Sequence, residues 1–527
     1  MELKLSLPSY PPIPKTGVET RAKQVQEWLD ALPLANSQES GRKLADAIAA
    51  LNSVDLGEEA RCNLLEHYRA TVCKLLPSLQ QLYVGKALPL SEKSLRAGDL
   101  MRELFTELAN GYKIALMDLS GRRANLATNK VTPLAMARAI ECLGGVLEVF
   151  YETYAPTSAG IWSELHRLYW YAAKLNIHNI SIADRDHDNV NTAFIKVLLL
   201  ALADPYRLLQ GQLADIKAYL AQLGQHALLQ PLGPTENKHG LFLVRLDGDK
   251  PPKALMHYQG VTDARTDIIL NTIPLARVLH QHVQALDAGE TLAKLGLPAG
   301  AHQAGYREML KRLIKQWGVA PKRMFNRLQL QSDAHICGGI TALHHMLSAD
   351  ALHSGNADET EEQQNLEVTD ALHGTGSQLS YNCSKWVVVN ESAGGVALAK
   401  NPESYAKLKV GDIIGVEEGQ SGCWGVGQVR WMQSDIDNRV EVGAQMLAPS
   451  AHPIAIKPVI APANALFQPA LLLPEVSALK QPARIVASRG SFQPMREFEV
   501  RSEGLIHQVR ADKLIEQTDS FDLFTFN

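Results

Sequence analysis

Apolar residues recur with the period of an α-helix over most of the chain from Lys15 to Trp317. In the last of these segments they fall at i, i+3, i+4 and i+7, and the segment ends at Gly318. The side chains that form this stripe are Tyr306, Met309, Leu310, Leu313, Ile314 and Trp317. The pattern predicts a large all-α N-terminal region, residues 1–317, whose helices bury one face each.

One stretch interrupts the helical pattern. Residues 241–246 are rich in β-forming side chains and lead into the Asp247-Gly248 step, a pair that is common in tight hairpin turns. We therefore predict a short β-hairpin near residues 240–256.

Short runs of β-forming residues replace the helical pattern beyond the last helix. The runs are residues 386–389, 410–416, 424–431 and 440–447. Turn-forming residues separate them, a rhythm that predicts a small antiparallel β-barrel over residues 329–457. After the apolar run 336–347, residues 348–382 are polar, acidic and glycine-containing. Such a stretch cannot bury a core, so we predict a mostly disordered insertion there.

Beyond Ala448 the chain becomes rich in proline. The prolines are Pro449, Pro453, Pro458, Pro462, Pro469, Pro474 and Pro482. Strand-like runs follow at 483–487, 498–501 and 505–510, and residues 521–526 alternate between apolar and polar. We predict a smaller C-terminal β module over residues 458–527, which makes the whole chain a multidomain α+β protein.

Two motifs near the barrel carry candidate chemistry. Arg323 and Arg327 lie four residues apart on a loop after the last helix, and the run from Asn390 to Gly395 follows a strand-like segment. An arginine fork can donate two parallel hydrogen bonds to a phosphate or to a guanine edge, and its plane can stack on a purine. Asn390 can pair with a guanine edge, Ser392 can donate to a phosphate, and Gly394 and Gly395 let the backbone approach a ligand closely.

In this order, and followed by a β-rich stretch, the two motifs resemble the RxxxR and [D/N]xSxxG motifs of the PilZ domain family, which are bacterial receptors for cyclic di-GMP. The resemblance covers about residues 322–449. It implies that Arg323, Arg327, Asn390, Ser392, Gly394 and Gly395 bind cyclic di-GMP, a dianion with two guanine bases. Arg430, on a predicted barrel strand, is an additional candidate phosphate contact, although a solvated strand arginine is the common alternative. No catalytic residue, metal or other cofactor is predicted.

The arginine motif also lies between the predicted helical region and the predicted barrel. We interpret residues 318–328 as a linker, and we expect a ligand that holds its arginines against the barrel to fix the orientation of the helical region. That region would then act on a protein partner that the sequence does not identify. The resemblance implies an output in motility, pili, adhesion or exopolysaccharide production.

Composition restricts the classes of partner. With 52 basic and 56 acidic residues the net charge is −4, so the chain has no overall attraction for nucleic acid. No apolar run is long enough to span a bilayer, and the first residues lack the apolar core of a signal peptide. Six scattered cysteines without a CxxC pair are typical of reduced thiols, so we expect a cytoplasmic protein.

Two other hypotheses remain open. A PilZ-like scaffold that no longer binds nucleotide is favoured by Asn390, where the family more often has Asp, and by the long separation between the two motifs. An enzyme in the helical region would depend on clusters that fit other roles better. The segment that contains Asp184, Asp186 and Asp188 has alternating acids, but it has neither the glycine nor the glutamate that a calcium loop requires. We therefore expect these aspartates, with Asn191, to begin a helix. One cluster of aromatic side chains has the spacing of the buried face of a helix: Trp162, His166, Tyr169, Trp170 and Tyr171. A group of four histidines has a spacing that matches no compact set of metal ligands: His335, His344, His345 and His353.

Overall fold

The computed structural model divides the chain into two compact units, which we call the helical unit (residues 1–86 and 90–322) and the barrel unit (residues 87–89 and 323–527). The division at residues 322 and 323 falls inside the predicted linker. The structure describes residues 3–10, 17–121, 126–127, 129–182, 189–209, 211–297, 303–318, 328–353, 383–392, 394–400, 407–419, 423–435, 439–462, 464–476, 481–502 and 504–527.

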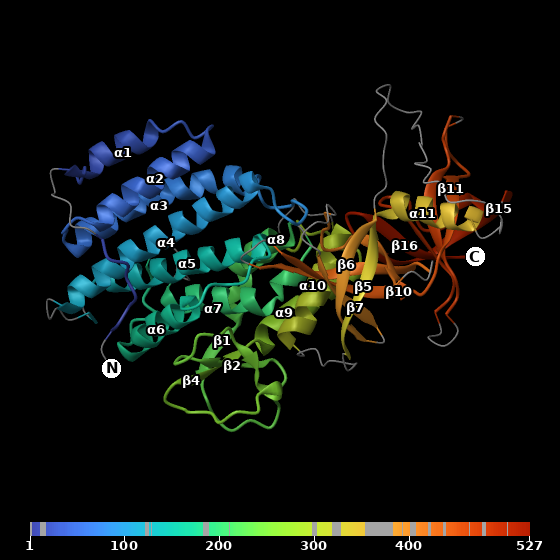
Figure 1. The fold of residues 1–527 in the computed structure, drawn as a ribbon. Helices are drawn as coiled ribbons and strands as arrows, with labels where there is room; N and C mark the ends of the chain where they lie inside the picture. The colour runs from blue at the N-terminus through green and yellow to red at the C-terminus, as the bar shows by residue number, and fades with distance from the viewer. Residues whose placement is uncertain are drawn as a thin grey trace. The chain divides into compact units, whose positions relative to one another are not determined.

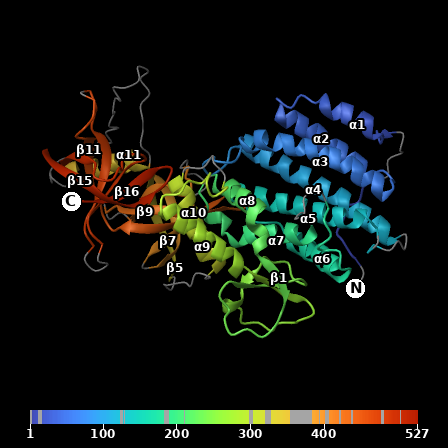
Figure 2. The ribbon, with the colours of Figure 1, turned by 180° about the vertical axis from the view of Figure 1, so that it is seen from behind.

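The helical unit confirms the predicted all-α character of most of the N-terminal region. Its helices are α1 (Ala22–Asp30), α2 (Ser37–Asn52), α3 (Glu58–Gln80), α4 (Glu92–Gly121), α5 (Val131–Glu152), α6 (Ile161–Lys174), α7 (Val190–Leu202), α8 (Gln212–Leu223), α9 (Ile273–Asp287) and α10 (Gln303–Gly318), with the short 3-10 helices η2 (Pro205–Arg207), η3 (Gly224–His226) and η4 (Leu255–His257). Figures 1 and 2 show α2 to α7 stacked side by side. One continuous apolar core runs through the unit, and α5 is buried along nearly its whole length.

Helix α7 begins differently from the prediction. Asn189 is its N-cap residue: the Asn189 side chain accepts a hydrogen bond from the Thr192 amide, and the Thr192 hydroxyl accepts one from the Asn189 amide. Such a capping box satisfies two amides that the first turn leaves without helical partners. Asn191 lies within the helix rather than before it, and residues 183–188 lie outside the described residues.

The aromatic group on α6 is part of the core, as predicted. Trp162, His166 and Tyr169 are buried, and Trp170 and Tyr171 pack against the same cluster. The ring of Tyr169 stacks on Phe194 with centroids 4.4 Å apart. These aromatic side chains therefore stabilise the contact between α6 and α7 and do not form an exposed partner surface.

A four-stranded antiparallel sheet interrupts the helices. Its strands are β1 (Leu228–Pro231), β2 (Leu241–Arg245), β3 (Lys253–Ala254) and β4 (Asp267–Asn271), in the order β1-β4-β2-β3. β2 and β3 pair within the stretch that the sequence marks as a hairpin, whereas β1 and β4 were not predicted. The loop between β2 and β3 also caps α6, since the Asp249 carboxylate accepts hydrogen bonds from the amides of Gly160 and Ser163.

The first part of the barrel unit is a closed six-stranded barrel, which confirms the predicted antiparallel barrel. We call it the middle barrel. Its strands are β5 (Leu328–Gly338), β6 (Ser384–Ser392), β7 (Gly395–Lys400), β8 (Ile413–Glu418), β9 (Gly425–Ser434) and β10 (Val440–Ala448), in the order β10-β7-β6-β5-β8-β9. Trp386, Val388, Leu398 and Val442 are among the residues buried in it.

Helix α11 (Ile340–His353) lies between β5 and β6 along the chain. The prediction of disorder was therefore wrong for residues 348–353, because alanine and leucine there continue the helix that the preceding apolar run begins. Residues 354–382, which hold the acidic centre of the predicted insertion, lie outside the described residues.

The C-terminal β module is a second closed six-stranded barrel, which we call the C-terminal barrel. Its strands are β11 (His452–Pro458), β12 (Gln468–Leu473), β13 (Arg484–Ser488), β14 (Glu497–Ser502), β15 (Leu505–Gln517) and β16 (Phe521–Phe526), in the order β11-β12-β13-β16-β15-β14.

The C-terminal barrel begins at His452, before the predicted start at Pro458, and includes two strands from the proline-rich stretch. Pro453 is opposite only β12, and Pro458 is opposite only β14. Pro469 is opposite only β11. A proline without an amide hydrogen is tolerated where a strand is paired on one side only.

The two barrels share an apolar core. Leu343 of α11, Trp424 of the middle barrel and Phe521 of the C-terminal barrel are all buried in one cluster. Figure 1 shows α11 lying beside both barrels. Burial of apolar surface is the main stabilising force in such contacts, so the two barrels and α11 form one folded body.

Candidate functional site

The predicted run from Asn390 to Gly395 forms the hairpin between β6 and β7. Ser392 is directly opposite Gly395, and the Ser392 hydroxyl donates a hydrogen bond to the Gly395 carbonyl at 3.2 Å. The amide of Met446 on β10 donates to the Gly394 carbonyl at 3.3 Å. The side-chain hydrogen bond closes the hairpin, and the backbone hydrogen bond holds the hairpin against β10.

Gly395 is required by the packing of the barrel itself. A Cβ atom at this position would lie closer than 3.0 Å to the backbone carbonyl oxygen of Ala444 on β10. A backbone atom in a closed barrel cannot move aside, so only glycine allows β7 to approach β10 this closely. The sequence interpretation gave this glycine a role toward the ligand, whereas the structure gives it a role between strands.

A β-bulge at Val389 turns the motif toward the outer face of the barrel. Val388 is opposite Leu398 and Asn390 is opposite Ala397, so Val389 is an extra residue in β6. Val388 is buried in the barrel interior. Without the bulge, Asn390 would share that inward face; with it, Asn390 and Ser392 lie on the outer face.

Strand pairing extends this outer face into a polar row. Gln329 of β5 is opposite Asn390, and Gln445 of β10 is opposite Gly395. Directly opposed residues of antiparallel strands place their side chains on the same face. We call Gln329, Asn390, Ser392, Gly395 and Gln445 the outer row. Gln329 and Gln445 were not predicted, because only the strand register reveals them.

Arg430 lies at the end of the outer row and is engaged with other side chains. Its Nε donates to Gln445 Oε1 at 2.8 Å, and its two terminal nitrogens donate to the carboxylate of Glu516 on β15 at 2.6 and 2.9 Å. Glu516 also accepts a hydrogen bond from Gln428 at 2.7 Å. The predicted phosphate contact is therefore next to the motif, but a carboxylate of the C-terminal barrel binds it in this structure.

Arg323 and Arg327 lie outside the described residues, and the structure describes the chain again from Leu328. Strand β5 begins at Leu328, which is opposite Glu391. Leu328 directly follows Arg327 in the chain, and Glu391 lies within the Asn390–Gly395 motif, so the residue next to the arginine motif is paired with the second motif. Helix α11 and residues 354–382 account for the long separation in sequence, since they lie between β5 and β6.

A groove of about 670 Å³ lies on the outside of the middle barrel, beside the outer row. The residues that line it are Gln329, Leu330, Gln331, Val387, Val389, Ala399, Lys400 and Arg439. Its volume lies within the range of roughly 300–1,000 Å³ that is typical of small-molecule sites. Partial burial lowers the pKa of Lys400, so an anion in the groove would stabilise the charged form of this lysine.

A carboxylate pair lies near the same end of the barrel. Burial and the neighbouring Glu391 carboxylate raise the pKa of Glu418. Glu391 is the residue between Asn390 and Ser392, and it is opposite Leu328, which directly follows the arginine motif. The negative charge here would be relieved by an arginine, so the site favours cationic side chains at its edge.

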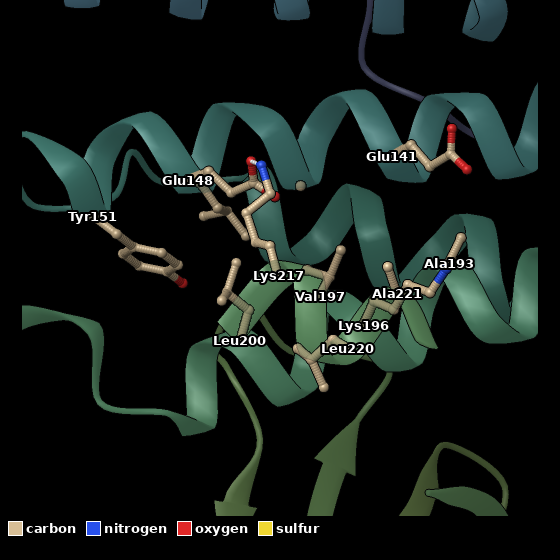
Figure 3. Close-up of a pocket in the computed structure, with 12 residues that line it drawn as sticks. Glu141, Glu148, Tyr151, Ala193, Lys196, Val197, Leu200, Lys217, Leu220 and Ala221 are labelled. Atoms are coloured by element: carbon tan, nitrogen blue, oxygen red, sulfur yellow. Dashed lines mark hydrogen bonds and ion pairs between the residues drawn. The ribbon is translucent and has the colours of Figure 1, made fainter. Parts of the chain in front are cut away.

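The helical unit holds a separate, more enclosed cavity of about 240 Å³ between α5, α7 and α8. Figure 3 shows Lys217 reaching toward Glu148 beside Tyr151 in this cavity. Glu141, Glu148, Lys196 and Lys217 line it, so its acidic and basic groups balance. Its volume lies below the usual range for small-molecule sites, roughly 300–1,000 Å³, and its charges offer no net attraction for an anion.

Comparison with known proteins assigns all three parts of the chain. Residues 23–235 match the family model described as the N-terminal domain of the cyclic-di-GMP receptor FimW. Residues 241–378 and 349–453 match its middle PilZ domain, and residues 454–527 match its C-terminal β-barrel domain.

One curated relative matches this chain along almost the whole length of both proteins. It is the cyclic-di-GMP receptor FimW of Pseudomonas aeruginosa, which is 25% identical over 96% of this chain and 90% of the relative. The three domain matches follow one another in chain order and together extend from residue 23 to the last residue. The N-terminal match lies almost entirely within the helical unit, the middle match starts in that unit and continues through the middle barrel, and the C-terminal match covers the C-terminal barrel from residue 454. The chain therefore belongs to the FimW family of PilZ-domain cyclic-di-GMP receptors.

Proposed function

We propose that this protein binds cyclic di-GMP on the outer face of the middle barrel, at the outer row and the adjoining groove. One observation carries the proposal: Leu328, the residue after the arginine motif, is paired with Glu391 in the middle of the Asn390–Gly395 motif. A PilZ-type site needs both motifs at one place, and the barrel register supports this by pairing the residue that follows Arg327 with the Asn390–Gly395 motif across the long intervening segment.

Four of the predicted residues would contact the ligand in different ways. Asn390 and Ser392 point outward from β6, where the amide can pair with a guanine edge and the hydroxyl can turn from Gly395 toward a phosphate. Arg323 and Arg327 would supply two positive charges from the chain that leads into β5. Charge-assisted hydrogen bonds of this kind contribute roughly 1.5–3 kcal/mol each. The groove beside Val387 and Val389 offers an apolar wall for a purine base.

Arg430 would take part by exchanging partners. Its guanidinium binds the Glu516 carboxylate, and a phosphate placed near Ser392 and Gly395 would compete for the same donors. Because Glu516 belongs to the C-terminal barrel, this exchange would connect nucleotide binding to the second barrel. In this role Arg430 leaves Glu516 and binds a phosphate of the nucleotide.

The output of the receptor would pass through the helical unit. In this proposal, binding of Arg323 and Arg327 to the ligand fixes the segment between the two units and thereby orients the helical unit toward a protein partner. Regulation of motility, pili, adhesion or exopolysaccharide production is the output that family resemblance suggests. The protein would act in the cytoplasm without catalytic turnover. Among the described helices, none has the length and apolarity needed to cross a membrane.

Calorimetric titration of the full chain tests nucleotide binding. Cyclic di-GMP is expected to bind with micromolar or tighter affinity, and GMP, which has one base and one phosphate, is expected to bind much more weakly. A Ser392→Ala variant should retain the fold and lose affinity. The absence of heat with cyclic di-GMP would favour the alternative function, a protein-interaction scaffold in which Glu516 holds Arg430 permanently.

Limited proteolysis tests the proposed action on the linker. Bound ligand is expected to slow cleavage between Gly318 and Leu328, because holding the arginines removes local opening of the chain. Cleavage elsewhere in the helical unit serves as the internal reference. The contrary result is that calorimetry detects binding while saturating cyclic di-GMP leaves cleavage in this segment unchanged. That result would show that the ligand does not fix the segment between the two units, although the protein still binds the nucleotide.

A further inference from the structure

Two cysteines lie directly across from each other where β5 ends and β6 begins. Ile336 of β5 is opposite Ser384 of β6, so the next residues in the same register are Cys337 and Cys383. Opposed residues of antiparallel strands have Cα atoms about 4.5–5.5 Å apart. Disulfides need Cα separations of about 4.4–6.8 Å, so the backbone already has the spacing that a disulfide requires.

The side chains of the pair also meet. The two thiols are within hydrogen-bond contact, and neither cysteine is part of a disulfide in this structure. Cys337 is buried in the apolar cluster shared by both barrels and α11, and Cys383 is half-buried against the same cluster. The surrounding core fixes both side chains, so they face each other without a rearrangement of the strands.

We propose that Cys337 and Cys383 form a reversible intramolecular disulfide, a modification site that is separate from the nucleotide site. The oxidant would be a low-molecular-weight disulfide such as glutathione disulfide. In a reducing compartment the pair rests as two thiols, and the disulfide forms when the concentration of such an oxidant rises.

The reaction proceeds in two exchange steps. The Cys383 thiolate, on the more exposed side, attacks one sulfur of the small disulfide, forms a mixed disulfide and releases one small thiolate. The Cys337 thiolate then attacks the Cys383 sulfur and expels the second small thiolate. The protein loses two electrons and two thiol protons, and the small disulfide is reduced to two thiols.

The second step is expected to be slow near neutral pH. The hydrogen bond with Cys383 and burial both raise the pKa of the Cys337 thiol, so little thiolate is present to attack. The mixed disulfide at Cys383 should therefore accumulate first and then convert to the protein disulfide. Raising the pH should speed this conversion.

The cross-link would close the loop of residues 338–382, which includes α11. It would tie the end of β5 to the start of β6, the same strand pair whose opposite end carries Leu328 and Glu391. Loop closure restricts the unfolded chain, so oxidation should raise the unfolding midpoint of the barrel unit by roughly 5 °C or more.

The test is oxidation of the purified full chain with glutathione disulfide, followed by intact mass measurement and peptide mapping. The expected product has lost two hydrogen masses and yields one cross-linked peptide pair that contains Cys337 and Cys383. Dithiothreitol should restore the original mass. Cys383→Ser should prevent the cross-link, and Cys337→Ala should stop the reaction at one glutathione adduct on Cys383.

Cys423→Ser, which removes an exposed thiol on the same unit, is the matched control and should leave the cross-link intact. If Cys337→Ala fails to fold, the Cys383→Ser variant and the peptide map still decide the question. Stable glutathione adducts on Cys383 with no further conversion at high pH, or cross-links that involve other cysteines instead, would overturn the proposal.

Discussion

Arg430 on β9 and Glu516 on β15 form a two-point ion pair that joins the middle barrel to the C-terminal barrel, with nitrogen-to-oxygen distances of 2.6 and 2.9 Å. The arginine is also bound by Gln445, which is opposite Gly395 of the predicted binding motif. One side chain therefore contacts both the edge of the candidate nucleotide site and the second barrel.

Breaking this ion pair should destabilise the barrel unit modestly. Both side chains are partly exposed, at 36% and 24%, so we expect a coupling free energy of about 1 kcal/mol between them. A double-mutant cycle with Arg430→Ala and Glu516→Gln, measured by denaturant unfolding, gives this value. The exposed pair Arg489 and Asp519 on the C-terminal barrel is the control and should show less coupling. Additive effects of Arg430→Ala and Glu516→Gln would contradict the account.

Gly395→Ala should destabilise the barrel unit by about 2 kcal/mol, because the added Cβ would overlap the Ala444 carbonyl oxygen. The relevant measurement is the free energy of unfolding from chemical denaturation. Gly233→Ala is the control, since an added Cβ there meets no atom within 4 Å. Equal stabilities of the two variants would show that β7 and β10 can separate at low cost.

The helical unit should lose stability as pH rises from about 4.5 through about 7 because of Glu152. Burial, followed by the nearby Glu148 carboxylate, raises the pKa of Glu152 from 4.5 to about 7. The folded state therefore binds this proton more tightly than the unfolded state, so the stabilising effect is complete below the unfolded pKa and disappears above the folded pKa. The size of the loss is about 3 kcal/mol, since each pKa unit corresponds to about 1.4 kcal/mol.

Glu152→Gln should remove this part of the pH dependence, because a neutral amide replaces the carboxyl group that Gln80 contacts at 2.8 Å. Thermal or denaturant unfolding at pH 5 and pH 8 gives the comparison, with Glu236→Gln as the control on an exposed loop. The same pH dependence in wild type and Glu152→Gln would rule out this residue as the source.

The hydrophobic and turn patterns of the sequence predicted most of the fold. They failed for elements whose structure depends on packing against several neighbouring elements. The barrel strands carry runs of Val, Ile and Trp that identify them without their neighbours. Helix α11 instead packs against both barrels, and its polar residues are too scattered to give a clear helical period. Strands β11 and β12 were missed because their prolines are tolerated only through one-sided pairing.

The sequence could predict only those site residues that lie close together along the chain. Asn390, Ser392 and Gly395 lie in one hairpin, so the sequence alone could connect them. Gln329 and Gln445 join the outer row through strand register, and Glu516 reaches it from a different barrel. No local pattern contains those relationships, which depend on closure of the middle barrel and its packing against the C-terminal barrel.

The central claim is that Arg323 and Arg327 bring cyclic di-GMP onto the outer face of the middle barrel. The most direct test is calorimetric titration of cyclic di-GMP into the wild type, Arg323→Ala and Arg327→Ala, with Arg489→Ala on the C-terminal barrel as the control. Each motif variant is predicted to weaken binding by about tenfold or more, and the control is predicted to bind like the wild type. Wild-type affinity in both motif variants would contradict the account.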